Sequence, residues 1–408
     1  MSRVAVVGAG LAGLACARAL AEAGAEPVVF EASDAVGGRV RTDLVDRFRI
    51  DRGFQVLLTA YPEARRVLDY GALDLRPFEA GARVWVGDRF ETLGDPFRRP
   101  SQAVSTLFAD VGSFADKLRV LRLRRSVTSV SDEALWGRPE LPTETALRER
   151  YGFSDRMVDR FFRPFLGGVL LDPSLSASSR AFEVYFKRFS QGEAAVPALG
   201  MQRIPEQMAD RLPAGSVRLN TPVASASARE VHTETGAEPF DAVVIAADAD
   251  ASARLLGDVE APGWRSTVQI AWAAPEAPID AAVLLLDGDR RGPVNNAQVM
   301  SRVAPSYAPE GQALVTASVL GEPPAVDTLD ASARAQLRGW FGPSVDAWRL
   351  LRVDRVRHAL PALASLEPPE RPVRHGGLYV AGDWRRNGSI NGALVSGRHA
   401  AEAVLADL

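Results

Sequence analysis

The chain has 408 residues, 47% of them hydrophobic, and a formal net charge of −3. A chain of this length is too long to fold around one ordinary hydrophobic core, so we expect two intertwined domains. Without a basic excess the chain cannot neutralise many phosphates, which argues against nucleic acid as a partner.

Cysteine and histidine usage narrows the chemistry further. The single cysteine, Cys16, excludes an intrachain disulfide, and the four scattered histidines form no metal site of known spacing, so no metal is expected. The first strand begins within a few residues of Met1, which leaves no room for a signal peptide. No apolar run approaches the roughly 20 residues that span a bilayer. We therefore expect a cytoplasmic protein, with membrane contact at most peripheral.

The chain opens with a predicted strand–helix–strand unit at residues 3–8, 11–23 and 27–31. Its first turn carries Gly8-x-Gly10-x-x-Gly13. Gly8 allows the tight turn, Gly10 leaves space for a pyrophosphate, and Gly13 lets the helix pack on the strand. The free N–H groups at the start of the helix then face the phosphates.

An acidic residue completes this pattern. Glu31 follows Gly8 by 23 positions, near the roughly 20 expected for an acid that binds a ribose hydroxyl. It would repel a 2′-phosphate, which disfavours NADP and leaves FAD and NAD open. The predicted dinucleotide site comprises Gly8, Ala9, Gly10, Leu11, Ala12, Gly13, Glu31 and Ala32.

The next segment contains Gly37-Gly38-Arg39. Two glycines allow close backbone approach, and the forked donors of Arg39 can offset pyrophosphate charge. The alternative is a solvated loop.

In the middle of the chain, the predicted strand–helix–strand pattern gives way to separate strands and then to a long helical segment. Strands are expected at 48–57 and 82–93, and a mostly helical segment at about 101–190, with interruptions at Trp136–Pro139 and Phe165–Gly168.

The second half returns to strands. Short strands are expected at 217–219, 223 and 231–235, and a buried strand of parallel type at 241–247. An antiparallel set follows at 266–274, 282–287, 296–303, 312–320 and 349–357, interrupted by a helix at about 328–341. A strand at 378–381 and a helix at 393–405 end the chain.

These elements predict a discontinuous organisation. Residues 1–55, 200–258 and 359–408 would form the dinucleotide-binding domain. Residues 56–199 and 259–358 would form the substrate-binding domain, with its helical insert at about 101–190.

The glycine pattern, Glu31, Gly37-Gly38-Arg39 and Gly382-Asp383 together resemble the flavin-containing amine oxidase superfamily. That group includes amine oxidases, protoporphyrinogen oxidase and phytoene-type desaturases and isomerases. The resemblance implies non-covalently bound FAD, since Cys16 lies at the wrong end of the site; covalent attachment at His399 is the alternative. It also implies an α/β fold: a Rossmann FAD domain of the glutathione-reductase type with a discontinuous α+β substrate domain, made of an antiparallel sheet and a helical cap.

The resemblance also assigns further cofactor contacts. It places Gly53, Phe54 and Gln55 beside the isoalloxazine ring and the backbone of Val223 at the adenine. It assigns contacts with the ribityl chain and the pyrimidine edge of the flavin to Gly382, Asp383, Ser389, Ile390, Asn391 and Ala393. A helix starting near Ala393 would stabilise negative charge on reduced flavin by about 0.5–2 kcal/mol. The alternative is that Ser389 or Asn391 merely caps that helix.

Two departures from the family pattern count against simple amine oxidation. The aromatic residue that amine oxidases hold before the last helix is absent at Ser389. The family's lysine is absent from the strand Thr267–Trp272, where Gln269 or a neighbour takes its place. Phe161–Val169 and Leu199–Met201 instead resemble the protoporphyrinogen oxidase and desaturase branch, in which such regions line a tunnel for large apolar substrates. An ordinary helical core is the alternative.

Residues 115–125 alternate basic and leucine side chains. A basic amphipathic helix of this kind can lie on anionic lipid, or it can simply be solvated on one face.

We therefore predict an FAD-dependent oxidoreductase that dehydrogenates a largely apolar organic substrate, such as an isoprenoid, a porphyrinogen or a secondary metabolite, by hydride transfer to flavin N5. No second glycine fingerprint follows a strand, so electrons would leave to oxygen or a quinone. No catalytic acid or base is assigned. Gln55, Trp272 and Trp384 are candidate walls of the substrate pocket. The alternatives are an amine oxidase, a non-redox flavin isomerase or mutase, and a non-catalytic FAD protein that serves a partner enzyme.

Overall fold

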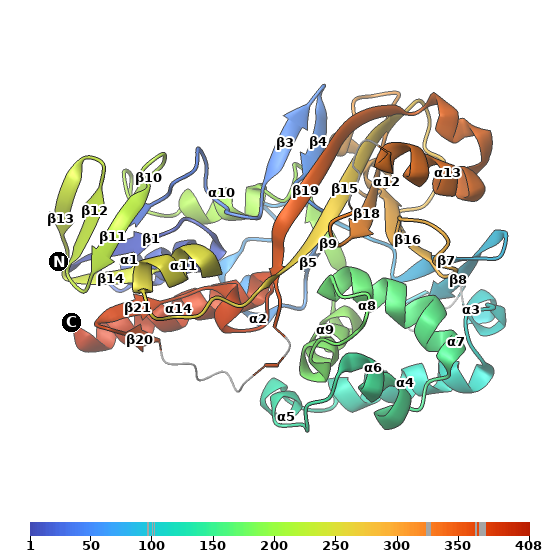
Figure 1. The fold of residues 1–408 in the computed structure, drawn as a ribbon, viewed down its shortest axis with the longest axis horizontal. Helices are drawn as coiled ribbons and strands as arrows, with labels where there is room; N and C mark the ends of the chain where they lie inside the picture. The colour runs from blue at the N-terminus through green and yellow to red at the C-terminus, as the bar shows by residue number, and fades with distance from the viewer. Residues whose placement is uncertain (96–97, 100, 102, 324–327, 364, 367–372) are drawn as a thin grey trace.

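The computed structural model describes residues 1–95, 98–99, 101, 103–323, 328–363, 365–366 and 373–408. Two large sheets lie at opposite ends of the molecule, and both chain termini lie at the end that carries the first sheet (Figure 1).

The first sheet has six strands in the order β10-β2-β1-β14-β21-β20. The strands are β1 (Arg3–Val7), β2 (Glu26–Phe30), β10 (Val217–Arg218), β14 (Ala242–Ile245), β20 (Arg374–His375) and β21 (Leu378–Val380). All pairs are parallel except β20 with β21. The central strands are buried on both faces, as apolar runs of this kind require in a parallel sheet.

Different elements cover the two faces of this sheet. Helices α1 (Leu11–Glu22) and α14 (Ile390–Asp407) pack on the face of Val4 and Val6. A small antiparallel sheet packs on the face of Ala5 and Val7; its strands are β11 (Val223–Ser227), β12 (Glu230–Thr233) and β13 (Gly236–Pro239). Helix α11 (Ala249–Leu256) follows β14.

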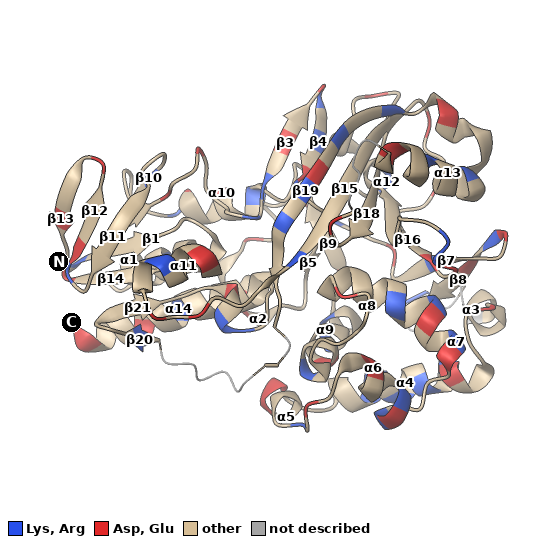
Figure 2. Cartoon of the chain, viewed as in Figure 1, with Lys and Arg blue, Asp and Glu red and all other residues tan. Residues whose placement is uncertain are grey.

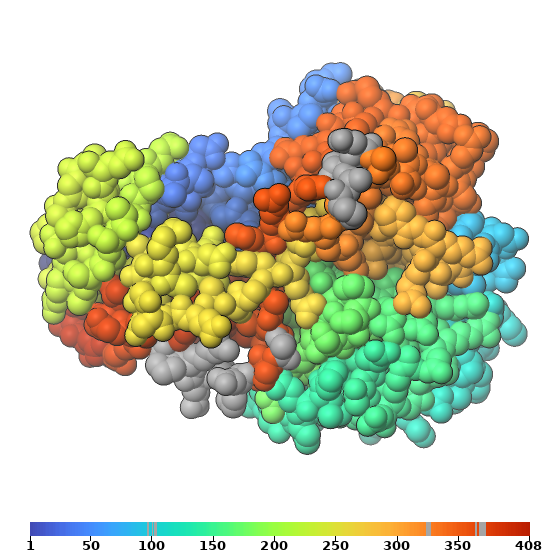
Figure 3. All heavy atoms as spheres, viewed as in Figure 1, coloured from blue at the N-terminus to red at the C-terminus, as the bar shows by residue number. Residues whose placement is uncertain are grey.

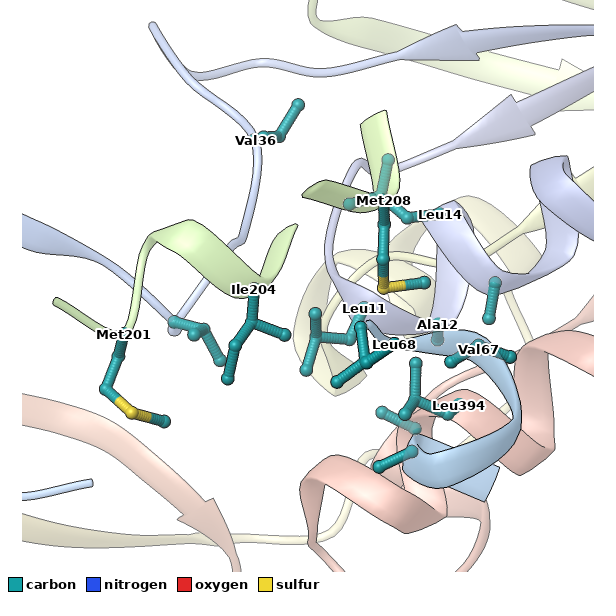
Figure 4. Packing of buried hydrophobic residues seen from close by; sticks show 14 of the residues in the cluster. Leu11, Ala12, Leu14, Val36, Val67, Leu68, Met201, Ile204, Met208 and Leu394 are labelled. Atoms are coloured by element: carbon teal, nitrogen blue, oxygen red, sulfur yellow. The ribbon is translucent and has the colours of Figure 1, made fainter. Parts of the chain in front are cut away.

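The first and last helices of the chain pack against each other in one apolar cluster (Figure 4). Leu11 and Leu14 of α1 meet Leu394 of α14 there, together with residues of α2 (Pro62–Val67) and α10 (Arg203–Ala209). Gly397 lets α14 approach α1 closely, since a Cβ at this position would lie only 2.0 Å from the carbonyl oxygen of Ala12.

The second sheet has seven strands in the order β19-β15-β18-β17-β16-β7-β8. The strands are β7 (Gly81–Val86), β8 (Arg89–Gly94), β15 (Trp264–Ala274), β16 (Leu284–Asp287), β17 (Asn296–Val299), β18 (Ala313–Leu320) and β19 (Arg349–Pro361). Only β7 and β16 pair in parallel. Helix α13 (Leu329–Phe341) covers one face, where it shares a cluster with Val268 and Ile270. Short α12 (Met300–Val303) and the turn η4 (Pro305–Tyr307) follow β17.

The helical cap packs against the second sheet (Figure 3). It has its own apolar cluster, which includes buried phenylalanines such as Phe162 and Phe182. Its helices are α3 (Ala103–Phe108), α4 (Phe114–Thr128), α5 (Asp132–Trp136), α6 (Thr143–Thr145), η2 (Ala146–Arg150), α7 (Asp155–Met157), η3 (Val158–Phe162), α8 (Arg163–Leu170) and α9 (Ser179–Gln191). Two small antiparallel sheets link the parts: β3 (Thr42–Val45) with β4 (Phe48–Asp51), and β5 (Leu57–Leu58) with β9 (Ala194–Pro197) and β6 (Leu75–Pro77).

The predicted fold class is confirmed: a Rossmann-type α/β part, an antiparallel sheet and a helical cap. The six strands of the first sheet all come from the three stretches assigned to the dinucleotide-binding domain, although the domain limits themselves stay a prediction.

Several local predictions are wrong. The strand expected at 48–57 is two strands, β4 and β5, and the strand at 82–93 is the hairpin of β7 and β8. The strand expected at 296–303 ends at Val299, where α12 begins. No interruption occurs at Phe165–Gly168, because both glycines lie inside α8 and let it approach the sheet.

Substitution of Gly397 by alanine tests the contact between the first and last helices. The added methyl would collide with the backbone of α1, so we expect a loss of about 1–3 kcal/mol in the free energy of unfolding. The matched control is Gly339→Ala in α13, where a Cβ would meet nothing within 4 Å and helix propensity favours alanine by about 1 kcal/mol. Urea denaturation of both variants checks this, and equal stability of the two would contradict the packing argument.

Candidate functional site

The turn between β1 and α1 forms a narrow cradle. Gly8 has φ of +110°, and a Cβ there would lie 2.8 Å from the carbonyl oxygen of Ala246. A Cβ at Gly13 would lie 1.8 Å from the carbonyl oxygen of Gly8, so only glycine fits. A Cβ at Gly10 would instead meet no protein atom within 4 Å. Gly10 therefore faces open space in an otherwise tightly packed turn.

The start of α1 points into the same space. Gly10 is its N-cap residue, and no side chain caps the helix. The Glu31 carboxylate at the end of β2 lies at the rim, where it accepts hydrogen bonds from the Ala9 N–H at 2.7 Å and the Ser33 N–H at 2.9 Å. The Gly37 N–H donates to the Ala9 carbonyl at 2.9 Å, which places the double-glycine loop against the cradle.

The C-terminal segment reaches this cradle through an ion pair. Nη2 of Arg39 lies 2.5 Å from Oδ1 of Asp383, a contact between residues 344 positions apart. The Arg39 guanidinium also lies 5.4 Å from the ring centre of Trp264. The Gly382 N–H donates to Oγ of Ser396 at 3.0 Å, which fixes this segment on α14.

Helix α14 starts at Ile390, three residues earlier than predicted, with Ser389 as its N-cap. Oγ of Ser389 accepts a hydrogen bond from the Gly392 N–H at 2.9 Å, so the capping role considered for Ser389 is confirmed. The Asn391 side chain serves α2 instead, since its Oδ1 accepts from the Glu63 N–H at 2.9 Å.

One cavity lies between the segment 49–55 and the second sheet; the space between its lining atoms, open solvent included, amounts to about 210 Å³. We call it the Gln269 cavity; its lining is Arg49, Ile50, Asp51, Gly53, Phe54, Gln55, Gln269, Met300, Tyr307, Leu314 and Thr316. Nε2 of Gln55 donates to the carbonyls of Arg39 and Arg52, which holds that side chain in place. Gln269 is 3% exposed, and within the described residues its Oε1 has no hydrogen-bond partner.

A buried carboxylate lies at the same cavity. Asp51 accepts hydrogen bonds from Oγ1 of Thr42 at 2.5 Å, the Met201 N–H at 3.0 Å and Oη of Tyr307 at 2.9 Å. Burial raises the pKa of Asp51 to about 6 in spite of these three donors.

Another cavity lies between the helical cap and the residues before α14; the space between its lining atoms, open solvent included, amounts to about 300 Å³. We call it the Tyr185 cavity; its lining is Leu170, Ala177, Ala181, Tyr185, Arg265, Leu360, Pro361, Leu363, Leu366, Asn387 and Gly388. Tyr185 donates its hydroxyl hydrogen to the Asn387 carbonyl. Burial raises the pKa of Tyr185 and of neighbouring Tyr61 well above the usual 10, so both phenols stay neutral.

The structure brings Gln55 to the Gln269 cavity but not the two predicted tryptophan walls. Trp272 points to the opposite face of the sheet, under α13, where its Nε1 donates to Asp330 at 2.6 Å. The prediction for Trp272 is wrong because its strand alternates, and Trp272 has the parity of Ile270 rather than of Gln269. Trp384 is 1% exposed and packs against Ala249 and Val380, outside the lining of both cavities.

Sequence reasoning missed several lining residues, among them Tyr185, Tyr307 and Thr316. One signal was available: Asn296, Gln298, Thr316 and Ser318 occupy alternate positions in strands whose other residues are apolar. Tyr185 and Tyr307 carried no such signal, because tyrosine on an amphipathic helix or turn is ordinary core material.

The chain matches the family model described as flavin-containing amine oxidoreductase over residues 11–405, and it belongs to that family. The family predicted from the glycine motifs is therefore confirmed. Members of this family are flavin-containing oxidoreductases, which supports an enzyme with a flavin cofactor.

Two relatives are only partly covered. Protoporphyrinogen oxidase 2 of Arabidopsis thaliana is 30% identical over 190 residues, which are 44% of this chain and 35% of that protein. A carotenoid phi-ring synthase of Streptomyces griseus is 27% identical over 348 residues, which are 73% of this chain and 65% of that enzyme. The chain thus spans less than two thirds of either relative.

Solved structures share the fold along the whole chain. An oxidoreductase from Methanosarcina mazei superposes with a TM-score of 0.76 at 18% identity, covering 98% of this chain and 100% of that one. A reduced UDP-galactopyranose mutase superposes with a TM-score of 0.72 at 18% identity, covering 100% and 96%. At these identities the likeness establishes the fold alone.

The buried carboxylate of Asp51 predicts a pH dependence of stability. Between pH 3.8 and about 6 the folded chain keeps a proton that the unfolded chain has released, so the free energy of unfolding falls as pH rises through this window. A shift of this size corresponds to about 3 kcal/mol. Asp51→Asn removes the titration, so denaturation of wild type and variant at pH 4 and pH 7 should show a smaller pH-dependent loss in the variant. Parallel curves for the two proteins would contradict the assignment.

Proposed function

We propose that the chain binds FAD non-covalently along the Gly10 cradle. The pyrophosphate would lie at the uncapped start of α1 and near Arg39, the ribose at Glu31, and the adenine at Val223. The flavin ring would lie between residues 53–55 and 389–393. The observation that carries this proposal is the open space at Gly10. A side chain at this position would meet no protein atom, and the uncapped start of α1 faces the same space, which leaves room for a bound anion.

Covalent attachment through the only thiol is unsupported. Cys16 is fully buried in α1, and burial raises the pKa of its thiol to about 12. A thiol in that state is a poor nucleophile. This supports the non-covalent mode.

The reaction we propose is dehydrogenation of a largely apolar organic substrate, with oxygen or a quinone as the electron acceptor. When bound, the flavin supplies the two-electron chemistry, as a hydride acceptor at N5. The Tyr185 cavity would hold the substrate, because its lining is mostly aliphatic. The protein then contributes orientation and exclusion of water.

No charged side chain at either cavity stands without a protein partner. Arg265 pairs with Asp172 at 2.9 Å, Arg49 donates to the Ser306 carbonyl at 2.6 Å, and Asp51 holds three donors. This favours an uncharged substrate over the protonated amine of an amine oxidase.

Gly10→Val tests cofactor and reaction together. The backbone at Gly10 has φ of −69° and ψ of 174°, which valine tolerates, so the variant should purify without yellow colour yet unfold at the temperature of flavin-free wild type. Wild type should carry FAD that a substrate bleaches in the absence of oxygen, and the variant should show neither signal. Wild-type FAD content in Gly10→Val would contradict the cradle assignment.

Other outcomes of the same experiment select the alternatives. Turnover that needs prior reduction of the flavin, without bleaching by substrate, would indicate an isomerase or mutase. Bleaching by primary amines alone would indicate an amine oxidase. Loaded protein that reacts with nothing and copurifies with an enzyme would indicate a non-catalytic role.

We also propose that the helical cap contacts a membrane surface. Among the described residues, six of the twelve exposed large hydrophobic side chains fall between positions 104 and 121: Val104, Leu107, Phe108, Phe114, Leu118 and Leu121. Phe108 is 79% exposed and Phe114 is 60% exposed. Within the described part of the chain no helix has the length and apolar character to cross a bilayer.

The basic residues of α4 join this surface. Phe114, Leu118 and Leu121 share one helical face with exposed Arg122 and Arg125. Figure 2 shows the basic positions of the helical cap in blue. Lys117 donates to the carbonyls of Leu107 at 2.5 Å and Ala109 at 2.9 Å, which holds α3 beside the start of α4. An apolar face bordered by arginine suits the interface of an anionic lipid layer.

Sedimentation with lipid vesicles tests this contact. Wild type should bind vesicles of phosphatidylcholine with phosphatidylglycerol, and the double variant Phe108→Ser, Phe114→Ser should bind at least about tenfold more weakly, because two apolar rings no longer leave water. Leu350→Ser removes an exposed leucine elsewhere, on β19, and should change nothing. Equal sedimentation of all three proteins would mean that the face is merely solvated.

A further inference from the structure

Polar side chains run across one face of the second sheet where apolar ones would be expected. Asn296 pairs with Ser318, Gln298 with Thr316, and Gln269 with Ser318. Directly paired residues point to the same side of a sheet, so these side chains share one face. We call the five residues Gln269, Asn296, Gln298, Thr316 and Ser318 the polar ladder.

The ladder is buried between two apolar regions. All five residues are at most 5% exposed. Along the same face, Ala271, Ala273 and Leu314 belong to the cluster of the first sheet, while Leu286 belongs to the cluster of the cap. Burial of amides and hydroxyls costs free energy unless each finds a partner. A face that served stability alone would be apolar here, as the opposite face is.

Hydrogen bonds link the ladder from the cap toward the Gln269 cavity. Nδ2 of Asn295 donates to the Pro164 carbonyl of α8 at 2.9 Å and to Oδ1 of Asn296 at 3.0 Å. Nδ2 of Asn296 lies 3.3 Å from both Oε1 of Gln298 and Oγ of Ser318.

The last link ends at the cavity itself. Nε2 of Gln298 donates to Oγ1 of Thr316 at 2.6 Å, which leaves the Thr316 hydroxyl hydrogen directed elsewhere. Thr316 and Gln269 both line the Gln269 cavity, and Oε1 of Gln269 has no partner among the described residues. The lining of the cavity thus provides one hydroxyl donor, from Thr316, and one side-chain amide, from Gln269.

We propose that Gln269 and Thr316 bind an uncharged group of the substrate that both donates and accepts hydrogen bonds, namely a hydroxyl or a neutral amide. The remaining ladder residues position this pair. The inference rests on the proposed function and deepens it: the substrate is a largely apolar molecule that carries such a group beside the segment 53–55 assigned to the flavin.

The nature of the lining supports this class of group. A protonated amine would be repelled by Arg49 of the lining, and the lining carboxylate that could offset its charge, Asp51, already accepts from Thr42, Met201 and Tyr307. A pure hydrocarbon would leave Gln269 unpaired, which carries the full cost of a buried polar atom.

Small probes test the proposal on the full chain. Binding of benzyl alcohol, toluene and benzylammonium is measured by ligand-observed NMR, on flavin-loaded wild type and on the Gly10→Val variant. Benzyl alcohol should bind about threefold to tenfold more tightly than toluene, the range expected for one net hydrogen bond between neutral groups. Tighter binding of toluene or of benzylammonium would overturn the proposal.

Matched variants assign the preference to the two residues. Gln269→Leu and Thr316→Val should remove the preference for benzyl alcohol and leave toluene binding unchanged, while Thr316→Ser should retain it. Thr267→Val is the control, because Thr267 lies on the same face but donates to the Val319 carbonyl at 3.0 Å and lies outside the cavity. Equal weakening of both probes would indicate a merely structural role, and an unchanged preference in Gln269→Leu and Thr316→Val would overturn the assignment.

The flavin readout separates the two levels of inference. If wild type takes up no FAD, the proposed function fails, whatever the probes do. If wild type is flavin-loaded and shows no preference for the alcohol, only the inference about the polar group fails.

Discussion

The close contact between the two ends of the chain is the constraint on which the rest of the structure depends. Gly397 lets α14 lie against α1, and Asp383 neutralises Arg39 beside the glycine turn. With these contacts in place, the start of α1 and the start of α14 lie close together (Figure 4), although the sequence separates them by almost its whole length. Each helix start contributes partial positive charge, which in the proposed function would face the phosphates at α1 and the reduced, negatively charged ring at α14.

The two faces of the second sheet differ in chemistry. Val268, Ile270 and Trp272 face α13 and form a dry core. The other face carries the polar ladder and opens at Gln269 to a cavity beside Gln55. Period-two alternation makes this division possible, because one strand presents different chemistry to each side. The cap reaches the ladder because Gly168 of α8 has no side chain where Asn296 lies.

The sequence predicted the nucleotide-type part well, because its elements are encoded locally. Buried parallel strands have continuous apolar sequences, which makes them recognisable. The glycine spacing is a direct consequence of close backbone packing at Gly8 and Gly13. The family resemblance also located Gln269 on the strand where amine oxidases hold a lysine. The cavity linings were not predictable in the same way. Tyr185 and Thr316 meet the site only through pairing between distant strands and helices, and Trp272 was misplaced because strand parity was not applied to it.

In the proposed function, the two cavities together constrain the substrate more tightly than either would alone. The Tyr185 cavity is mostly aliphatic, and the charge of Arg265 there is compensated by Asp172. The Gln269 cavity is small, and its free hydrogen-bonding capacity is neutral. A hydrocarbon would fit the Tyr185 cavity but leave the polar groups of the Gln269 cavity unpaired, while an amine would suit neither cavity. A molecule with an apolar body and a hydroxyl or amide satisfies both. Such a molecule would also partition to a lipid surface, which is consistent with the exposed apolar face of the cap.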